Sequence, residues 1–405
     1  MSRAERHLYP ARPVAGPLHI LLTVNSAWNA VNFRRALIAA LLARGHRVTV
    51  LAPADAHAAR LVEMGCRFVP LAMDNQGLSP LRDAFLWGRF IAQFRALRPD
   101  LVLGFTIKNN IYGAHVAARL GIPFLPNVTG LGTAFMGDGW LSRLAQTLYR
   151  QAFAAAPVVF FQNGDDRQLF LDRRLVRPGQ VRMLPGSGID LARFAPEPAT
   201  MPGTGVRFLL IARLLRDKGV VEYAEAADRL RAAHPGARFQ LLGALGAANR
   251  TAIDPGLLRG WVARGGIDYL GETDDVRPFI READCIVLPS YREGTPRSLL
   301  EAGAMARPVI ATAVPGCRDV VADGVTGLLC RAHDSADLAR TMAEMIALGP
   351  ARRCAMGAAG RRRIAAIYDE AHVVEAYRRE IDRLALSPRP WDAAISRAGA
   401  PHLAR

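Results

Sequence analysis

The chain has 405 residues, of which 51% are hydrophobic and 22% charged, and this composition excludes a disordered, collagen-like or coiled-coil protein. The length favours two domains, each large enough to bury its own core. The 52 basic and 36 acidic residues give a net charge of +16, which favours an anionic partner: a phosphorylated substrate, an acidic lipid surface or a nucleic acid.

Short apolar runs alternate with helical patterns along the chain, as is typical of βαβ units. A proline- and glycine-rich segment at 195–206 interrupts the alternation, which then restarts. The segment 335–386 has a helical pattern and no strand candidate. Strands are predicted at 19–24, 47–53, 66–73, 100–105, 122–128, 157–161, 181–184, 207–212, 238–243, 267–271, 285–289 and 308–312.

We therefore predict an α/β protein with two doubly wound, parallel-sheet domains of the Rossmann type. The first domain is expected at 1–194, the linker at 195–206 and the second domain at 207–370. Residues 371–405 are expected to form a C-terminal helix, packing back on the first domain, and a tail. Ligands of such sheets bind beyond the carboxyl ends of the strands, and two facing sheets would place them between the domains.

Positive charge is concentrated in the first half of the chain. Residues up to Asp190 include 22 basic and 11 acidic side chains, against 30 and 25 in the remainder. Lys108 and Lys218 are the only two lysines among the 52 basic residues. A lysine retained among so many arginines is a candidate for a position that needs a compact ammonium, although chance explains either one.

Several site types are disfavoured by the sequence. The glycine, histidine and serine patterns of dinucleotide, P-loop, zincin and hydrolase sites are absent, and no two aspartates lie two positions apart. We therefore expect a phosphate site without a metal and no cofactor. Five cysteines without metal or disulfide spacing, and no predicted signal or membrane span, favour a cytoplasmic protein.

The segment 289–308, PSYREGTPRSLLEAGAMARP, follows a predicted buried strand. Thr295 is expected to cap a helix with Pro296 at its first position, and Gly294 lets backbone N–H groups approach an anion. Glu293 and Glu301 could accept hydrogen bonds from the paired hydroxyls of a sugar or ribose. The alternative is that Glu301 is an ordinary helix glutamate.

Two basic residues follow the first strand of the second domain, in RFLLIARLLRDKG. Arg213 lies at the carboxyl end of that strand, and Lys218 lies at the entry to the next helix. Both could reach one diphosphate, the arginine as a fork and the lysine as a point charge. A solvated loop with scattered positive charge is the alternative.

The segment 213–219, the two glutamates separated by seven residues, and ARPVIATAVPGCRDVVADGVTGLL resemble the retaining GT-B glycosyltransferases of family 4. The resemblance covers nearly the whole chain. It implies that Arg213 and Lys218 bind the diphosphate of the donor, that Glu301 holds the nucleotide ribose and that Glu293 lies near the transferred sugar. The expected donor-binding residues are Arg213, Lys218, Gly243, Glu293, Gly294, Thr295, Ser298, Leu299 and Glu301.

The segments NFRRALIAALLARGHRVTVLAP, TIKNNIYG, NVTGLGTAF and LPGSGIDLARF are similar to a bacterial subgroup that builds capsule, O-antigen or glycan-lipid chains on undecaprenyl-diphosphate-linked acceptors. This similarity implies a UDP-hexose or UDP-N-acetylhexosamine donor. The residues expected on the acceptor side are Lys108, Asn109, Asn127, Thr129, Gly130 and Gly132.

Many family members carry a histidine beside the sugar, where this chain has Asn127 and Thr129. No catalytic base is therefore assigned. The expected catalytic groups are Arg213 and Lys218, which would stabilise the departing diphosphate, and Glu293, which would orient the sugar.

The segment 79–99, SPLRDAFLWGRFIAQFRALRP, combines four aromatic side chains with four arginines, a mixture expected of a helix on an anionic membrane. A core helix with snorkelling arginines is the alternative. Together with a lipid-linked acceptor, the segment favours a peripheral position on the cytoplasmic face of the inner membrane.

Two other functions are alternatives to a glycosyltransferase. A UDP-sugar epimerase can also use two doubly wound domains around a UDP-sugar. A basic nucleic-acid-binding protein would explain the charge, but the arginines are dispersed and no binding motif is present, so we expect no nucleic-acid partner.

Overall fold

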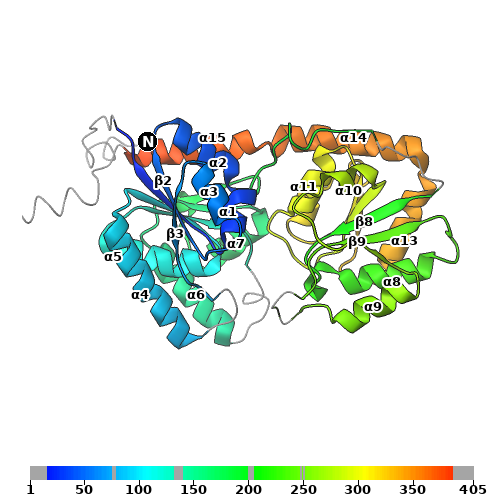
Figure 1. Cartoon of the computed structure of the whole chain (residues 1–405), viewed down its shortest axis with the longest axis horizontal. Coiled ribbons are helices and arrows are strands. Elements are labelled where there is room, and N and C mark those ends of the chain that lie inside the picture. Colours follow the sequence, from blue (N-terminus) through cyan, green and yellow to red (C-terminus); the bar gives the residue numbers. More distant parts are fainter. Residues whose placement is uncertain are drawn as a thin grey trace, which may run out of the picture. The chain divides into compact units, whose positions relative to one another are not determined.

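A computed structural model describes residues 16–74, 79–131, 140–198, 205–246, 249 and 251–385 of the chain. The chain folds as two compact units (Figure 1). The first unit comprises Met1–Leu184 and Val373–Arg405, and the second comprises Pro185–His372.

The first unit contains a seven-stranded parallel sheet with the order β3-β2-β1-β4-β5-β6-β7. Each strand coincides with an apolar run of the sequence, which confirms the predicted strands of this half. The strands are β1 (His19–Thr23), β2 (Arg47–Ala52), β3 (Arg67–Pro70), β4 (Leu101–Phe105), β5 (Phe124–Val128), β6 (Val159–Phe161) and β7 (Val181–Met183).

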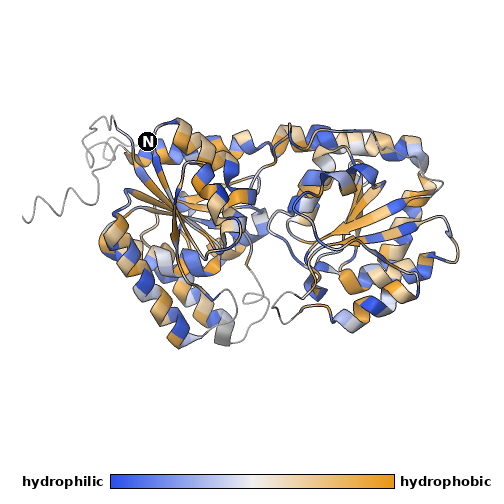
Figure 2. Cartoon of the chain, viewed as in Figure 1, coloured by the Kyte–Doolittle hydropathy of each residue, from blue (hydrophilic) through white to orange (hydrophobic). Residues whose placement is uncertain are grey.

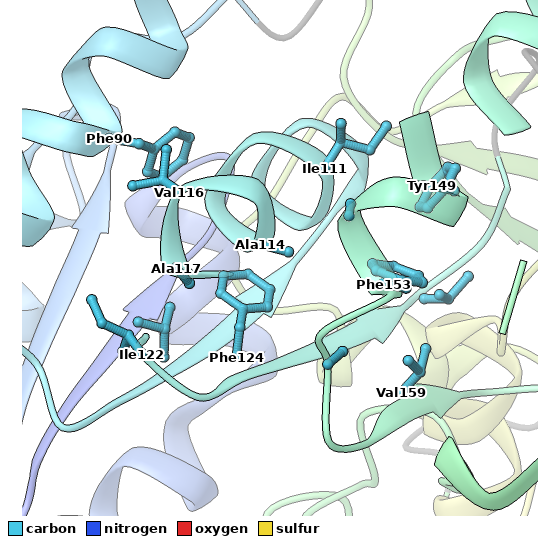
Figure 3. Packing of buried hydrophobic residues seen from close by; sticks show 14 of the residues in the cluster. Phe90, Ile111, Ala114, Val116, Ala117, Ile122, Phe124, Tyr149, Phe153 and Val159 are labelled. Carbon is cyan, nitrogen blue, oxygen red and sulfur yellow. The ribbon is translucent and has the colours of Figure 1, made fainter. Parts of the chain in front are cut away.

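Helices cover both faces of this sheet, because successive strand residues point to opposite sides. On β4, Val102 packs into one core cluster while Leu101 and Leu103 pack into the other. Figure 3 shows part of the first cluster, in which Phe90, Phe124 and Phe153 come from three different elements. The helices are α1 (Ala27–Phe33), α2 (Arg35–Ala43), α3 (Ala58–Glu63), α4 (Pro80–Leu97), the π-helix η2 (Asn109–Gly113), α5 (Ala114–Leu120), α6 (Trp140–Phe153), α7 (Gly164–Asp172), the 3₁₀ turn η4 (Pro178–Gln180) and α15 (Glu370–Ala385).

The second unit contains a six-stranded parallel sheet with the order β10-β9-β8-β11-β12-β13. Figure 2 shows that the strands of both sheets are mainly hydrophobic, as expected of strands buried on both faces. One strand of this sheet, β13, was not predicted. The strands are β8 (Arg207–Ile211), β9 (Arg238–Leu242), β10 (Asp268–Tyr269), β11 (Cys285–Leu288), β12 (Val309–Thr312) and β13 (Gly327–Cys330).

Helices again pack on the two faces: α8, α9 and α13 contribute to one core cluster, α10, α11 and α12 contribute to the other, and α14 contributes to both. No strand lies between residue 335 and the end of the described chain at residue 385, as predicted. The helices are α8 (Val220–Leu230), α9 (Pro255–Ala263), α10 (Arg277–Glu282), α11 (Arg297–Ala304), α12 (Cys317–Val320), α13 (Ser335–Ala347) and α14 (Gly349–Ile367), with the 3₁₀ turn η5 (Arg216–Lys218). Within the described ranges, no helix has both the length and the apolar character that a membrane crossing requires.

The boundary between the units lies after Leu184, not at residue 194 as predicted. The physical reason is that Ile189 and Phe194 are buried in a core cluster of the second unit, so their segment belongs to that unit. Of the predicted linker at 195–206, residues 199–204 lie outside the described residues.

Helix α15 joins the first unit through a buried tyrosine. Tyr377 is fully buried, and its ring lies 4.6 Å from that of Phe160. Its hydroxyl accepts a hydrogen bond from Asn127 Nδ2 at 2.9 Å. Val373 and Ile381 of the same helix are buried in the same cluster, so the end of the described chain completes one face of the first sheet.

We expect Tyr377→Ala to lower the free energy of unfolding of the first unit by about 3–5 kcal/mol, because it leaves a cavity beneath α15. Tyr377→Phe should cost about 1–3 kcal/mol, because it leaves the buried Asn127 amide without an acceptor. Urea titration followed by circular dichroism measures both values.

Arg379→Ala is the matched control on the same helix, since the Arg379 side chain is 74% exposed. Its effect should stay within about 0.5 kcal/mol. If Tyr377→Ala loses no more unfolding free energy than Arg379→Ala does, the anchoring role of Tyr377 is contradicted.

Candidate functional site

The loops after β8, β9 and β11 meet at the carboxyl edge of the second sheet, because these neighbouring strands are parallel. Glycines let the loop backbones lie against one another. A Cβ at Gly219 would collide with the carbonyl oxygen of Pro289, and one at Gly243 would collide with that of Ala212. Gly219 also has φ +71°, a value that side chains other than glycine rarely adopt. The edge is therefore closely packed at the level of the backbone.

Lys218 and Glu293 are brought together at this edge. Lys218 Nζ lies 2.5 Å from Glu293 Oε1, and the two side chains are 22% and 13% exposed. The loops that carry them are joined by hydrogen bonds to the Asp217 carbonyl oxygen, one from the Tyr291 N–H at 2.9 Å and one from Ser290 Oγ at 3.0 Å. A predicted phosphate-binding cation thus lies against a predicted sugar-binding carboxylate.

Glu301 lies one turn into α11, where Arg297 Nε donates a hydrogen bond to its Oε1 at 3.0 Å. The Glu301 side chain is only 12% exposed. Burial raises the pKa of Glu301 above its ordinary value, and the Arg297 guanidinium opposes that rise. The positive charge of Arg297 thus compensates the negative charge of the largely buried Glu301 carboxylate.

The prediction that Thr295 caps the helix with Pro296 at its first position is wrong. Helix α11 begins at Arg297 and Pro296 is its N-cap, because Pro296 has an extended ψ of 117° and its carbonyl accepts from the Leu299 and Leu300 N–H groups. A Cβ at Gly186 would lie 2.7 Å from Thr295 Cβ, which places Thr295 against the segment where the chain enters this unit.

The other predicted donor residues line the same edge to different extents. Arg213 is exposed directly after β8, and Ser298 is half-buried in the first turn of α11. Gly294 is buried, and the side chain of Leu299 belongs to the core. The Leu299 side chain is therefore closed to a ligand, and its N–H already donates to the Pro296 carbonyl.

In the first unit, Lys108 is engaged by a carboxylate. Its Nζ lies 2.8 Å from Asp83 Oδ1 of α4, and the two side chains are 13% and 8% exposed. Burial raises the pKa of the Tyr112 phenol, and the charge of the same carboxylate, which accepts its hydrogen bond, raises it further. An anionic ligand of Lys108 would have to compete with Asp83.

Asn109 and Asn127 are fully buried. Asn109 Oδ1 accepts from Thr23 Oγ1 at 2.5 Å, and its Nδ2 donates to Thr106 Oγ1 at 2.9 Å. The Asn127 amide donates to Tyr377, as described above, and accepts from Gln162. Both amides hold elements of the protein together, so neither side chain offers an exposed surface to an acceptor.

Thr129 and Gly130 follow β5 and are half-buried, and Gly130 has φ +145°. Gly132 lies outside the described residues. Of the acceptor-side residues predicted from the sequence, Lys108, Thr129 and Gly130 are therefore the described ones that keep some exposed surface.

Sequence reasoning missed Arg297 and Asp83, the charged partners of Glu301 and Lys108. The spacing of Arg297 and Glu301, four residues apart on a predicted helix, was a usable signal for their ion pair. The contact between Asp83 and Lys108 had no such signal, since it joins a helix to a distant strand end. Among the described residues, no cluster of three or more His, Cys, Asp or Glu side chains is arranged to hold a metal ion.

The second unit thus presents two cations, Arg213 and Lys218, and two carboxylates, Glu293 and Glu301, in the loops and first helical turns at one sheet edge. Cations suit a diphosphate, and buried carboxylates suit pairs of hydroxyls. A nucleoside diphosphate sugar contains both kinds of group.

Comparison with known families identifies both halves of the chain. Residues 30–186 match the family described as "Glycosyl transferase 4-like domain". Residues 205–347 match the family described as "Glycosyl transferases group 1".

Two curated relatives cover most of the chain. The N,N'-diacetylbacillosaminyl-diphospho-undecaprenol alpha-1,3-N-acetylgalactosaminyltransferase of Campylobacter jejuni is 26% identical over 377 residues, which are 87% of this chain and 95% of that protein. The glycogen synthase of Mycobacterium tuberculosis is 26% identical over 371 residues, which are 82% of this chain and 86% of that protein.

Solved structures share the fold. Sucrose-phosphate synthase from Thermosynechococcus elongatus superposes with a TM-score of 0.75 at 20% identity, covering 90% of this chain and 99% of that one. HepE from Anabaena, solved in complex with UDP-glucose, superposes with a TM-score of 0.74 at 17% identity, covering 90% of this chain and 100% of that one.

We expect Glu293→Gln to bind inorganic pyrophosphate about two- to tenfold more tightly than the wild-type protein, because the substitution releases Lys218 from its carboxylate. Lys218→Gln should bind it about tenfold more weakly. Isothermal titration calorimetry at low ionic strength measures both affinities.

Glu344→Gln provides the control, because Glu344 pairs with Arg340 on α13 and its side chain is 50% exposed. This variant should bind pyrophosphate as the wild type does. Unchanged or weaker binding by Glu293→Gln would show that the carboxylate does not compete with the anion.

Proposed function

Because this chain belongs to the glycosyltransferases of the group 1, GT4-like type with the GT-B fold, we propose a specific reaction for it. In this proposed reaction, the protein transfers a hexose or N-acetylhexosamine from a UDP-sugar to a glycan linked to a polyprenyl diphosphate. The transfer retains the anomeric configuration and needs no metal ion. Its product is an intermediate of a cell-surface polysaccharide or glycan lipid.

The observation that carries the donor assignment is the grouping of Arg213, Lys218, Glu293 and Glu301 at one edge of the second sheet. The Lys218–Glu293 contact of 2.5 Å shows that a cation and a carboxylate reach the same point from different loops. UDP-glucose in the HepE structure supports a uridine nucleotide as the donor.

The acceptor assignment is supported by the Campylobacter jejuni relative, whose name specifies an undecaprenyl-diphosphate-linked acceptor and which aligns with 87% of this chain. The free cysteines support action in a reducing compartment, since all five cysteine positions are described and none is paired. These observations favour the cytoplasmic face of the inner membrane as the place of the reaction.

In the proposed reaction, the bond between the anomeric carbon and the β-phosphate oxygen breaks, and a bond from that carbon to an acceptor hydroxyl oxygen forms. The acceptor hydroxyl proton passes to the departing diphosphate, and UDP leaves. Lys218 and Arg213 stabilise the charge that develops on the diphosphate. Glu293 orients the sugar, and Glu301 holds the ribose.

The proposal is tested by measuring UDP release from a panel of UDP-sugars in chelator, with and without a bacterial extract of polyprenyl-diphosphate-linked glycans. We expect release that requires one particular UDP-sugar together with the lipid. Conversion of the sugar nucleotide without lipid would instead indicate an epimerase. The absence of both turnover and uridine nucleotide binding would refute the donor site.

Two variants in the same assay separate the assigned roles. Glu301→Ala should chiefly raise KM for the donor, whereas Lys218→Ala should chiefly lower kcat at saturating donor, each by at least about tenfold. Wild-type kinetics in either variant would contradict the role of that residue.

We further propose that α4 contacts an anionic membrane surface. Its inner side is part of the core, since Phe90 and Phe94 are fully buried. Its outer side exposes Leu81 and Phe85, at 68% and 62%. The exposed arginines of this helix are Arg82, Arg89 and Arg95. Apolar side chains flanked by arginines are complementary to an acidic bilayer surface.

We expect the protein to float with vesicles that contain an anionic lipid, and Leu81→Ser with Phe85→Ser to reduce the bound fraction severalfold, because each exposed apolar side chain adds to the area buried in the bilayer. Val62→Ser is the control: Val62 is 58% exposed on α3, which packs on the opposite face of the sheet. Equal flotation of the double variant and the control would exclude α4 as the contact.

A further inference from the structure

Arg297 joins three parts of the second unit through one guanidinium. Its Nε donates to Glu301 on the next turn of α11. Its Nη1 lies 3.3 Å from Ser187 Oγ and 3.2 Å from the carbonyl oxygen of Gly188. Its Cζ lies 5.9 Å from the ring centroid of the buried Phe194, and its side chain is 20% exposed. One side of the guanidinium thus faces the carboxylate and the other faces a backbone loop.

The loop at 186–188 is the segment with which the chain enters the second unit. Gly188 has φ +71°, and a Cβ there would collide with Glu370 Cα, where the chain leaves the same unit. The Ile189 N–H donates to the Tyr368 carbonyl at 2.8 Å, and the Glu370 N–H donates back to the Ile189 carbonyl at 3.2 Å. The segment that enters the unit and the segment that leaves it are therefore hydrogen-bonded to each other. Arg297 links Glu301 to the entering segment.

The charges around Glu301 come from three elements. Arg297 lies on its own helix, Arg193 lies on the entering segment and Asp275 lies before α10. Burial and Asp275 disfavour the ionised carboxylate, whereas the two arginines favour it. Arg297 donates a hydrogen bond to Glu301 as well as contributing its charge.

We propose that Arg297 is a positioning residue of the donor site, which holds the Glu301 carboxylate ionised and in place for the ribose hydroxyls and anchors it to the loop at 186–188. This inference rests on the proposed function, because it takes the role of Glu301 from there. An arginine is required because its fork reaches the carboxylate and the loop together, which a lysine ammonium cannot do in the same geometry.

The test is calorimetric titration with UDP between about pH 5.5 and about pH 8.5 for the wild type, Arg297→Gln and Arg297→Lys. Arg297→Gln should bind UDP about tenfold more weakly at the alkaline end. Its affinity should fall further as the pH drops, starting at a higher pH than in the wild type. Without the arginine the Glu301 carboxyl takes up its proton at higher pH, and a protonated carboxyl accepts fewer hydrogen bonds from ribose.

Two further variants separate the effect of the positive charge at position 297 from the effect of the hydrogen bonds that anchor Glu301. Arg297→Lys should lose affinity but keep the pH dependence of the wild type, since the positive charge remains. Glu301→Gln should bind weakly and lack the additional loss at low pH that Arg297→Gln shows. Titration of the UDP phosphate affects all proteins alike, so affinities are compared as ratios to the wild type.

Arg340→Gln is the matched control, because it removes an arginine that pairs with Asp337 on α13. It should bind UDP as the wild type does at every pH. Wild-type affinity and pH dependence in Arg297→Gln would overturn the inference while leaving the donor site intact. If Arg297→Gln does not fold, a wild-type UDP affinity in Arg297→Lys overturns it equally. Failure of the wild type to bind UDP would overturn the proposed function itself.

Discussion

Backbone packing at the carboxyl edge of the second sheet is the constraint on which the candidate site depends. Gly219 and Gly243 leave no room for a Cβ beside the carbonyl groups of neighbouring loops. A Cβ at Gly316 would likewise collide with the carbonyl oxygen of Gly294. With the loops this close, side chains from the segments that follow β8 and β11 can meet, as they do in the Lys218–Glu293 ion pair. A side chain at any of these glycines would push apart the loops that form the candidate site.

Predicted site residues form three ion pairs that are largely buried. Lys218 is paired with Glu293, Glu301 with Arg297, and Lys108 with Asp83, and each of these six side chains is less than a quarter exposed. Partly buried charges without partners would be costly. A charged ligand at any of the three pairs has to exchange one ionic contact for another, so the pairs set the electrostatic cost of binding.

The two units use buried polar contacts in different ways. In the first unit, Asn127 joins β5 to α15 and so ties distant parts of the chain into one core. In the second unit, Arg297 joins α11 to the segment where the chain enters the unit. The first contact stabilises the scaffold. The second contact is made by the arginine that also binds Glu301, a residue of the candidate donor site. One polar contact therefore supports the fold of the first unit, and the other supports the candidate site of the second.

The architecture can be read from the amino-acid sequence alone, because buried parallel strands appear as short apolar runs separated by helical patterns. Twelve strands were located in this way, and the missed strand β13 is a four-residue run at the edge of its sheet. Local patterns made Glu293, Glu301, Arg213 and Lys218 candidates for the site, and the resemblance to family 4 implied their roles. The long-range contacts came from the tertiary structure, since the contact between Lys218 and Glu293 spans 75 positions and that between Asn127 and Tyr377 spans 250. In the structure, α11 begins at Arg297 instead of Pro296, because the backbone angles of Pro296 are not helical. The boundary between the units lies after Leu184 instead of residue 194, because core packing places the following segment in the second unit.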